Sequence, residues 1–123
     1  MLVQMKVRGL MFDPINSAYI IILRGEENTE VLPIWIGKPE ANAISLAVEG
    51  TFTPRPTTHD LIKNTLDALD AKVISIVVTD LKDNTYFSTI HLMYHDSEFT
   101  IDSRPSDAIA LALRADAPIF ATE

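Results

Sequence analysis

The most constraining feature of this sequence is the similarity between two segments that lie far apart in the chain. Residues 34–48 read IWIGKPEANAISLAV, and residues 100–113 read TIDSRPSDAIALAL. In both, a short strand-like run leads into a polar turn, a proline and an apolar helical pattern, which is how helices commonly begin. This similarity predicts that the chain forms the same strand–turn–helix unit twice, with acidic residues and an arginine at the turns.

Strand patterns precede each of these two helices. Alternating or β-branched runs predict strands at residues 3–7, 19–23, 31–36, 73–78, 85–94, 99–101 and 119–121. Pro33 places its strand at a sheet edge or a bulge. The pattern therefore predicts an α+β fold of two repeats, each with three strands and a helix. We expect antiparallel or mixed sheets packed with about three helices.

The helix that follows Arg104 is apolar almost all round, so we expect it to be nearly fully buried. Residues 51–70 read as an inserted loop and helix, capped by Thr57 or Thr58. The apolar stripe expected on that helix consists of Leu61, Ile62, Leu66 and Leu69. At 123 residues the chain is near the commonest domain size. We therefore predict one domain, residues 1–123, with halves near 1–50 and 71–121 around the insertion.

Composition narrows the function classes. The absence of cysteine excludes disulfides, thiolate nucleophiles and Cys-ligated zinc. A net charge of −7 disfavours long-range steering of a polyanion, although a local arginine cluster or a divalent metal can reverse the sign within one site. The longest apolar run near the start is too short to cross a bilayer, and no targeting segment is apparent. We expect a cytoplasmic protein without membrane contact.

Several acidic residues and one arginine lie close together at the turns of these two similar segments. Glu40 and Asp107 fall in the first turns of the two helices, and Asp102 with Arg104 precedes the second. One interpretation is helix capping, with Ser103, Ser106 and Asp107 stabilising the helix start by about 0.3–1 kcal/mol for each charge. The other is that Glu40, Asp102 and Asp107 hold Mg²⁺ or Mn²⁺ while arginine binds phosphate.

The segment PRPTTHD supplies a second candidate group. Arg55 between two prolines is stiffly presented and suits an anionic ligand. His59 and Asp60 fall in the first turn of the next helix, where His59 could act as a general acid or base. The alternative is structural: Thr57 caps, Asp60 bonds back, and His59 is solvated. Trp35 is expected in the core or an interface. No nucleotide or cofactor motif is present, so we expect no organic cofactor.

Several segments together resemble a known family. LPIWIG, PRPTTHDL, VTDL and RPSDAIALALR occur in that order between residues 32 and 120, and they resemble the bifunctional nuclease domain family. The resemblance implies a compact α+β domain and, from some plant members, degradation of both DNA and RNA. The positions that match its motifs are Glu40, Arg55, His59, Asp60, Asp102, Arg104, Ser106 and Asp107.

Two functional hypotheses follow, besides a small-molecule binder that would use the cleft between the two repeats. The first is a metal-assisted nuclease that hydrolyses DNA or RNA. Its catalytic residues would be His59, Asp60, Asp102 and Asp107, its phosphate-binding residues Arg55, Arg104 and Ser106, and its Mg²⁺ or Mn²⁺ ligands Glu40, Asp102 and Asp107. The alternative is a non-catalytic binding or regulatory module. In it the same charges form structural ion pairs, and the apolar edge strand at residues 31–36 favours a homo-oligomer.

Overall fold

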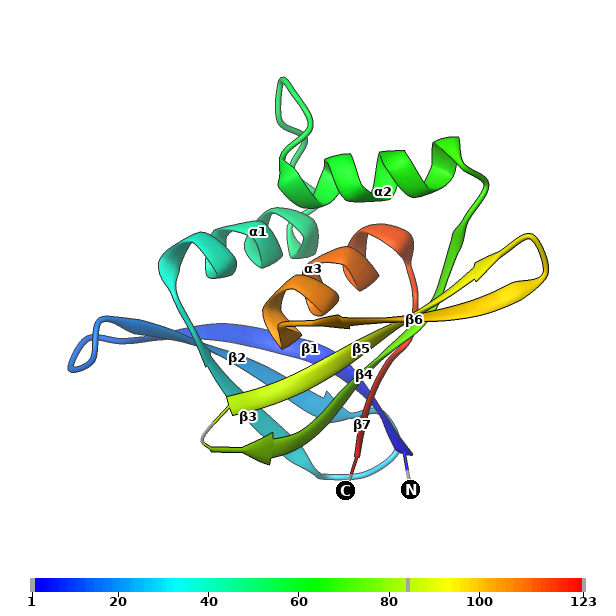
Figure 1. Ribbon diagram of the computed structural model, residues 1–123. Coiled ribbons are helices and arrows are strands. Elements are labelled where there is room, and N and C mark those ends of the chain that lie inside the picture. The colour runs from blue at the N-terminus through cyan, green and yellow to red at the C-terminus, as the bar shows by residue number, and fades with distance from the viewer. Residues whose placement is uncertain (1, 84, 123) are drawn as a thin grey trace.

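The computed structural model describes residues 2–83 and 85–122 (Figure 1). Three strands and a helix come first: β1 (Leu2–Asp13), β2 (Ala18–Gly25), β3 (Val31–Ile36) and α1 (Lys38–Val48). A second helix, α2 (Thr58–Ala68), follows. The chain then forms β4 (Lys72–Lys82), β5 (Thr85–Tyr94), β6 (Ser97–Ser103), α3 (Pro105–Ala115) and β7 (Ile119–Thr122). The predicted α+β class is confirmed.

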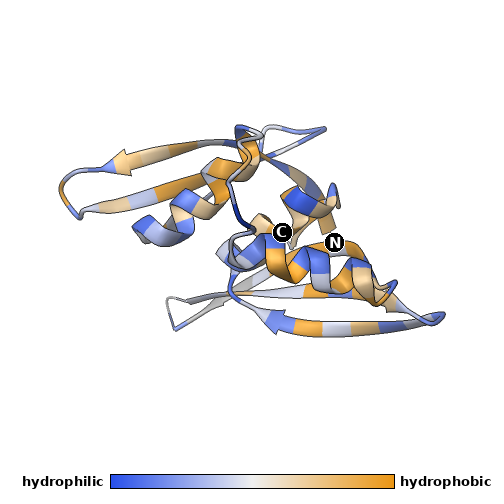
Figure 2. Cartoon of the chain, turned by 90° about the horizontal axis from the view of Figure 1, so that it is seen from above, coloured by the Kyte–Doolittle hydropathy of each residue, from blue (hydrophilic) through white to orange (hydrophobic). Residues whose placement is uncertain are grey.

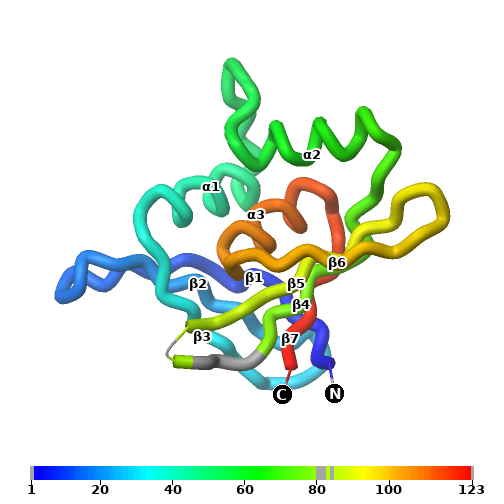
Figure 3. The backbone as a smooth tube through the Cα atoms, in the orientation of Figure 1, coloured from blue at the N-terminus to red at the C-terminus, as the bar shows by residue number. Residues whose placement is uncertain are grey.

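One mixed sheet carries all seven strands, in the order β3-β2-β1-β7-β4-β5-β6. Neighbouring strands are antiparallel except β4 and β7, which pair in parallel. The two three-strand groups therefore flank β7, and the three helices gather on one side of the curved sheet (Figure 1). Leu2 pairs with Thr122, which places the two ends of the described chain side by side (Figure 3). Duplication of the two halves stays a prediction.

The core forms around α3, as its apolar sequence predicts. Hydrophobic and hydrophilic residues alternate along the strands and helices (Figure 2). The helix α3 packs against both α1 and α2 and also against β4 and β5. Its buried residues are Pro105, Ser106, Ala108, Ile109, Ala110, Leu111 and Ala112. The helix ends at Asp116, whose φ of 53° lies in the left-handed region.

The helix α2 differs from its predicted packing. Leu66 packs against the core, but Leu61, Ile62 and Leu69 are exposed. The residue that α2 buries is His59. The helix therefore lies on the outside of the helical layer (Figure 1), and a polar side chain rather than an apolar stripe joins it to α3.

The two edges of the sheet are β3 and β6. Pro33 pairs with Ile22 in the edge strand β3, which confirms the placement that its sequence predicts. Trp35 of the same strand is 57% exposed, so it does not lie in the core, and its place in an interface stays a prediction. Among the described residues no helix is long and apolar enough to span a bilayer.

Candidate functional site

A pocket of about 360 Å³ opens where the N-terminal ends of α2 and α3 meet the side of α1. Its lining comes from all three helices and from the residues just before α2 and α3. The lining residues are Pro39, Glu40, Asn42, Ala43, Leu46, Thr57, Thr58, His59, Arg104 and Asp107. Four of the residues singled out from the sequence therefore share one cavity: Glu40, His59, Arg104 and Asp107.

His59 and Asp107 form the contact that joins α2 to α3 in this pocket. The His59 Nε2 atom lies 2.9 Å from Asp107 Oδ1, although the residues are 48 positions apart. His59 is only 9% exposed, so the interpretation of a solvated surface histidine is wrong. Thr57 is the N-cap residue of α2, which fixes His59 in the first turn, where it faces α3.

Asp107 also binds Arg104. The Arg104 Nε atom lies 2.8 Å from Asp107 Oδ2, and Nη2 lies 3.2 Å from Oδ1. Burial opposes ionisation of Asp107, but the hydrogen bonds from Arg104 and His59 outweigh it and hold the pKa of this carboxyl below its usual range. The carboxylate thus carries two partners that can both be cationic.

Capping does not explain these side chains. Arg104 is the N-cap residue of α3, and in the described chain this helix has no hydrogen bond from a capping side chain. The Ser103 hydroxyl instead lies 2.9 Å from the Ser88 hydroxyl, in the adjacent strand β5. Ser103 therefore does not cap α3 through its side chain. Asp107 does lie in the first turn, so stabilisation of its charge by the helix stays an interpretation, and its carboxylate is hydrogen-bonded to His59 and Arg104.

Glu40 both caps its helix and lines the pocket. The Gly37 N–H donates a hydrogen bond of 3.1 Å to Glu40 Oε1. A Cβ atom at Gly37 would lie 2.6 Å from that oxygen, so a side chain there would require the Glu40 carboxylate to move. The hydrogen bond and the charge of Asp107 raise the pKa of Arg104, and the negative charge of Glu40 adds to the rise.

Asp60 and Arg114 form a second ion pair beside the pocket. The Arg114 Nε atom lies 2.6 Å from Asp60 Oδ1, and the arginine side chain is only 9% exposed. Two further guanidinium hydrogen bonds reach carbonyl oxygens of α3 and α1, at Ala110 and Ala43. One buried arginine therefore ties the three helices together. Sequence reasoning missed Arg114, and its only signal was a charge in the last turn of an apolar helix.

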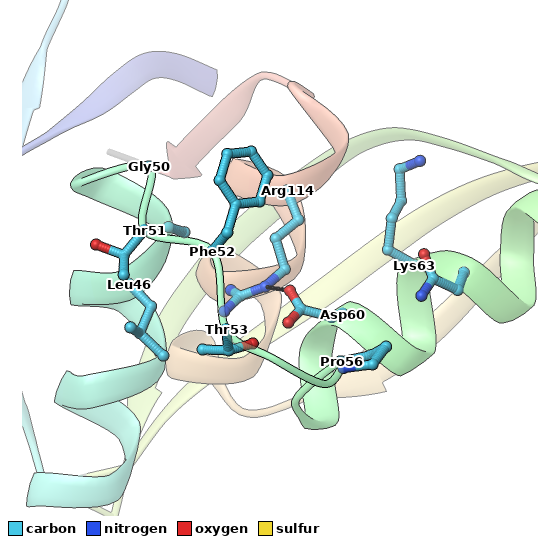
Figure 4. Close-up of a pocket in the computed structure, with 11 residues that line it drawn as sticks. Leu46, Gly50, Thr51, Phe52, Thr53, Pro56, Asp60, Lys63 and Arg114 are labelled. Atoms are coloured by element: carbon cyan, nitrogen blue, oxygen red, sulfur yellow. Dashed lines mark hydrogen bonds and ion pairs between the residues drawn. The ribbon is translucent and has the colours of Figure 1, made fainter.

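The environment of Asp60 accounts for its ionisation. The Thr57 N–H donates to Asp60 Oδ2 at 2.9 Å, which confirms that Asp60 bonds back to the helix start. This backbone hydrogen bond, followed by the bond from Arg114, lowers the pKa of Asp60 to about 2. Figure 4 shows the Asp60–Arg114 contact at one wall of a neighbouring pocket of about 400 Å³, beside Phe52 and Lys63.

Four of the sequence candidates lie outside the pocket, and Asp60, which lines the neighbouring pocket, is one of them. Asp102 pairs with Thr89, whereas the preceding residue, Ile101, pairs with the buried Ile90. Because side chains alternate along a strand, Asp102 points to the face of the sheet away from the core. Arg55 lies exposed in the loop before α2. The described residues contain no group of three or more histidine, aspartate or glutamate side chains placed to hold a metal ion.

Ser106 is the fourth candidate outside this pocket. It is buried at the start of α3 and lines a separate cavity, together with Arg104 and Glu40. The structure therefore brings together Glu40, His59, Arg104 and Asp107, with Asp60 next to them as part of the interhelical ion pair.

Comparison with known proteins shows the family. An uncharacterized protein from Mycobacterium tuberculosis (strain H37Rv) is 34% identical over 98% of this chain and 71% of its own length. Bifunctional nuclease 1 from Oryza sativa subsp. japonica is 27% identical over 82% of the chain and 32% of its own length. Bifunctional nuclease 2 from Arabidopsis thaliana is 29% identical over 80% of the chain and 31% of its own length. The model of the bifunctional nuclease domain matches residues 21–123, so this chain belongs to the bifunctional nuclease domain family.

Proposed function

We propose that this chain hydrolyses phosphodiester bonds in DNA, RNA or both, and that the reaction takes place in the pocket between α1, α2 and α3. One observation carries the proposal: a single carboxylate, Asp107, binds a buried histidine and an exposed arginine inside a cavity. Acid–base and anion-binding groups thereby lie side by side, which is what phosphoryl transfer requires. The plant relatives named as nucleases favour this chemistry over others.

His59 is the proposed general acid or base. An ionised carboxylate can only accept hydrogen bonds, so Nε2 carries the proton that Asp107 accepts. That bond fixes the tautomer and leaves the lone pair on Nδ1. Among the described residues, Asp107 is the hydrogen-bond partner of the His59 ring, which it contacts through Nε2. Every fully buried side-chain nitrogen of these residues has a hydrogen-bond partner, so Nδ1, which has none, is not fully buried. The Nδ1 atom therefore reaches the solvent of the pocket, where it can take a proton from water or return one to a leaving oxygen.

Arg104 is the proposed phosphate-binding residue. A guanidinium has five N–H donors, and the Nε and Nη2 atoms of Arg104 each use one on Asp107. The side chain is 64% exposed, so the remaining donors are open to a ligand. Asp107 thus orients both His59, the proton-transfer group, and Arg104, the anion-binding group. Because both side chains bind this one carboxylate, it also sets the distance between them.

Mg²⁺ or Mn²⁺ is the proposed cofactor. Magnesium is commonly held by one or two carboxylates together with substrate phosphate oxygens. Glu40 provides one carboxylate in this pocket, whereas both oxygens of Asp107 already accept hydrogen bonds from His59 and Arg104. Asp102, on the other face of the sheet, is left out of this ligand set. When bound, such an ion polarises the phosphoryl group and acidifies bound water.

The test is cleavage of single-stranded DNA and of RNA, with Mg²⁺ or Mn²⁺, by the wild type and by Asp107→Asn and Arg104→Ala. We expect both variants to lose about 10²- to 10⁴-fold in rate, the usual contribution of a positioned acid–base group. His91→Asn is a matched control, because His91 also contacts an acid, Glu98, but lies on β5 outside the pocket. Equal residual activity in all four proteins indicates a contaminating nuclease and defeats the proposal.

A non-catalytic oligomeric module is the second candidate function. Its supporting observation is the free edge of β3, where Val31 and Trp35 expose apolar surface. The helical ion pairs would then serve stability alone. Light scattering decides this: a dimer mass that falls to a monomer in Val31→Lys supports assembly through β3, whereas a monomeric wild type removes this candidate.

A further inference from the structure

A third cavity adjoins the proposed nuclease pocket. It has a volume of about 360 Å³ and lies between the end of β3, the start of β5 and the start of α3. The residues that line it are Ile34, Trp35, Ile36, Gly37, Glu40, Thr85, Tyr86, Arg104, Pro105 and Ser106. Arg104 and Glu40 also line the nuclease pocket. A ligand bound to Arg104 can therefore extend from one cavity into the other.

The lining of this cavity differs chemically from that of the nuclease pocket. Trp35, 57% exposed, and the half-buried Tyr86 contribute two aromatic side chains from separate strands. The charged residues are Arg104 and Glu40, which have opposite signs. This composition suits a flat, uncharged group that stacks on an aromatic surface, and it does not suit a second phosphate.

The cavity also contains a polar group for which the described residues supply no partner. Ser106 is only 5% exposed, and the described residues supply no hydrogen-bond partner for its hydroxyl. Every fully buried side-chain oxygen of the described residues has a hydrogen-bond partner. The Ser106 hydroxyl is therefore not fully buried, and it opens into the cavity that it lines. A hydroxyl donates one hydrogen bond and accepts others, so it can pair with the edge of a heterocyclic ring.

We propose that this cavity binds the nucleobase next to the phosphate held by Arg104, a role that rests on the proposed nuclease function. The base lies against Trp35 or Tyr86, and its polar edge faces Ser106. A base in this position cannot remain stacked inside a duplex, so the nucleotide bound here is unpaired. Affinity then comes partly from stacking, which is consistent with a chain whose net charge of −7 gives little attraction to a polyanion.

The experiment uses the fluorescence of Trp35, the only tryptophan in the chain. The wild type is titrated in EDTA with a short deoxythymidine oligonucleotide and with an abasic oligonucleotide of equal length. We expect the first to quench or shift the emission and the second to leave it unchanged. Equal responses to the two oligonucleotides would overturn the inference, because the base would then make no contact in this cavity.

Variants supply the second arm, read by the anisotropy of a labelled oligonucleotide. Trp35→Ala should weaken binding by about 5- to 150-fold, and Trp35→Phe, which keeps an aromatic ring, should restore most of it. Phe52→Ala is the matched control, because Phe52 is 98% exposed but lies outside the cavity. Unchanged affinity in Trp35→Ala would also overturn the inference. Base-dependent binding without cleavage refutes the nuclease function alone, and cleavage without base-dependent binding refutes this subsite alone.

Discussion

His59 of α2 and Asp107 of α3 meet at 2.9 Å between Nε2 and Oδ1, and this contact joins two helices that are separated by three strands in the sequence. It is also the contact that makes His59 the buried residue of α2. A helix that exposes Leu61 and Leu69 while burying a histidine is poorly explained by packing alone. The proposed chemistry of the pocket depends on this polar contact.

The ion pair between Asp60 and Arg114 should support the fold rather than the reaction. We expect Asp60→Asn to lower the free energy of unfolding by about 1–3 kcal/mol, the usual contribution of a hydrogen bond to a charged group. Arg114 would keep its charge in a buried position. Urea unfolding measures the effect. Asp67→Asn is the control, because it breaks the exposed Lys63–Asp67 pair within the same helix and should cost less than about 0.5 kcal/mol.

The same carboxyl predicts a pH dependence of stability. The pKa of Asp60 falls from 3.8 to about 2 in the folded chain. A lowered pKa means that the folded state favours the ionised form, so this contribution to stability is complete above the unfolded value and is lost as the pH falls through the folded value. Wild-type stability should therefore drop between about pH 4 and pH 2. Asp60→Asn should show a shallower drop in acid denaturation, and an identical pH profile would contradict this assignment.

A side chain at Gly37 should weaken the hydrogen bond that caps α1. Substitution of Gly37 by alanine would place a Cβ atom 2.6 Å from Glu40 Oε1 and displace the carboxylate from the Gly37 N–H. We expect a loss of about 0.5–2 kcal/mol in unfolding free energy, as for other helix N-caps. Gly9→Ala is the control, since no atom lies within 4 Å of the Cβ position there. Equal melting temperatures for the two variants would show that the Glu40 cap contributes no stability.

Metal dependence distinguishes two acids that the sequence could not separate. Glu40→Gln should raise the Mg²⁺ concentration needed for half-maximal cleavage, because Glu40 lines the proposed nuclease pocket. Asp102→Asn should leave that concentration unchanged, because Asp102 lies on the outer face of the sheet. A larger effect from Asp102 than from Glu40 would contradict the proposed ligand set.

Much of the architecture was predictable because it is encoded locally. Pro33 at an edge strand and the apolar sequence of α3 each report on their own element through backbone geometry or burial. The family resemblance, read from short segments in a fixed order, was predictable for the same reason.

The site was predictable only in part, because it depends on contacts between elements distant in sequence. Nothing near Arg114 indicates that its guanidinium reaches α1 and α2. The position of Asp102 follows from strand register, where a shift of one residue reverses the face. His59 could be named as a candidate, but its burial against Asp107 follows from the packing of α2 on α3, which periodicity does not specify.

The most direct test of the central claim is a double-mutant cycle on His59→Gln and Asp107→Asn, measured as single-turnover cleavage of RNA and single-stranded DNA. If the two side chains act as one unit, each single variant should lose about 10²- to 10⁴-fold, and the double variant should be little worse than either. Thermal melts confirm that the variants are folded. Losses that multiply in the double variant, or an unchanged rate in either single variant, would contradict the claim that His59 and Asp107 act together in catalysis.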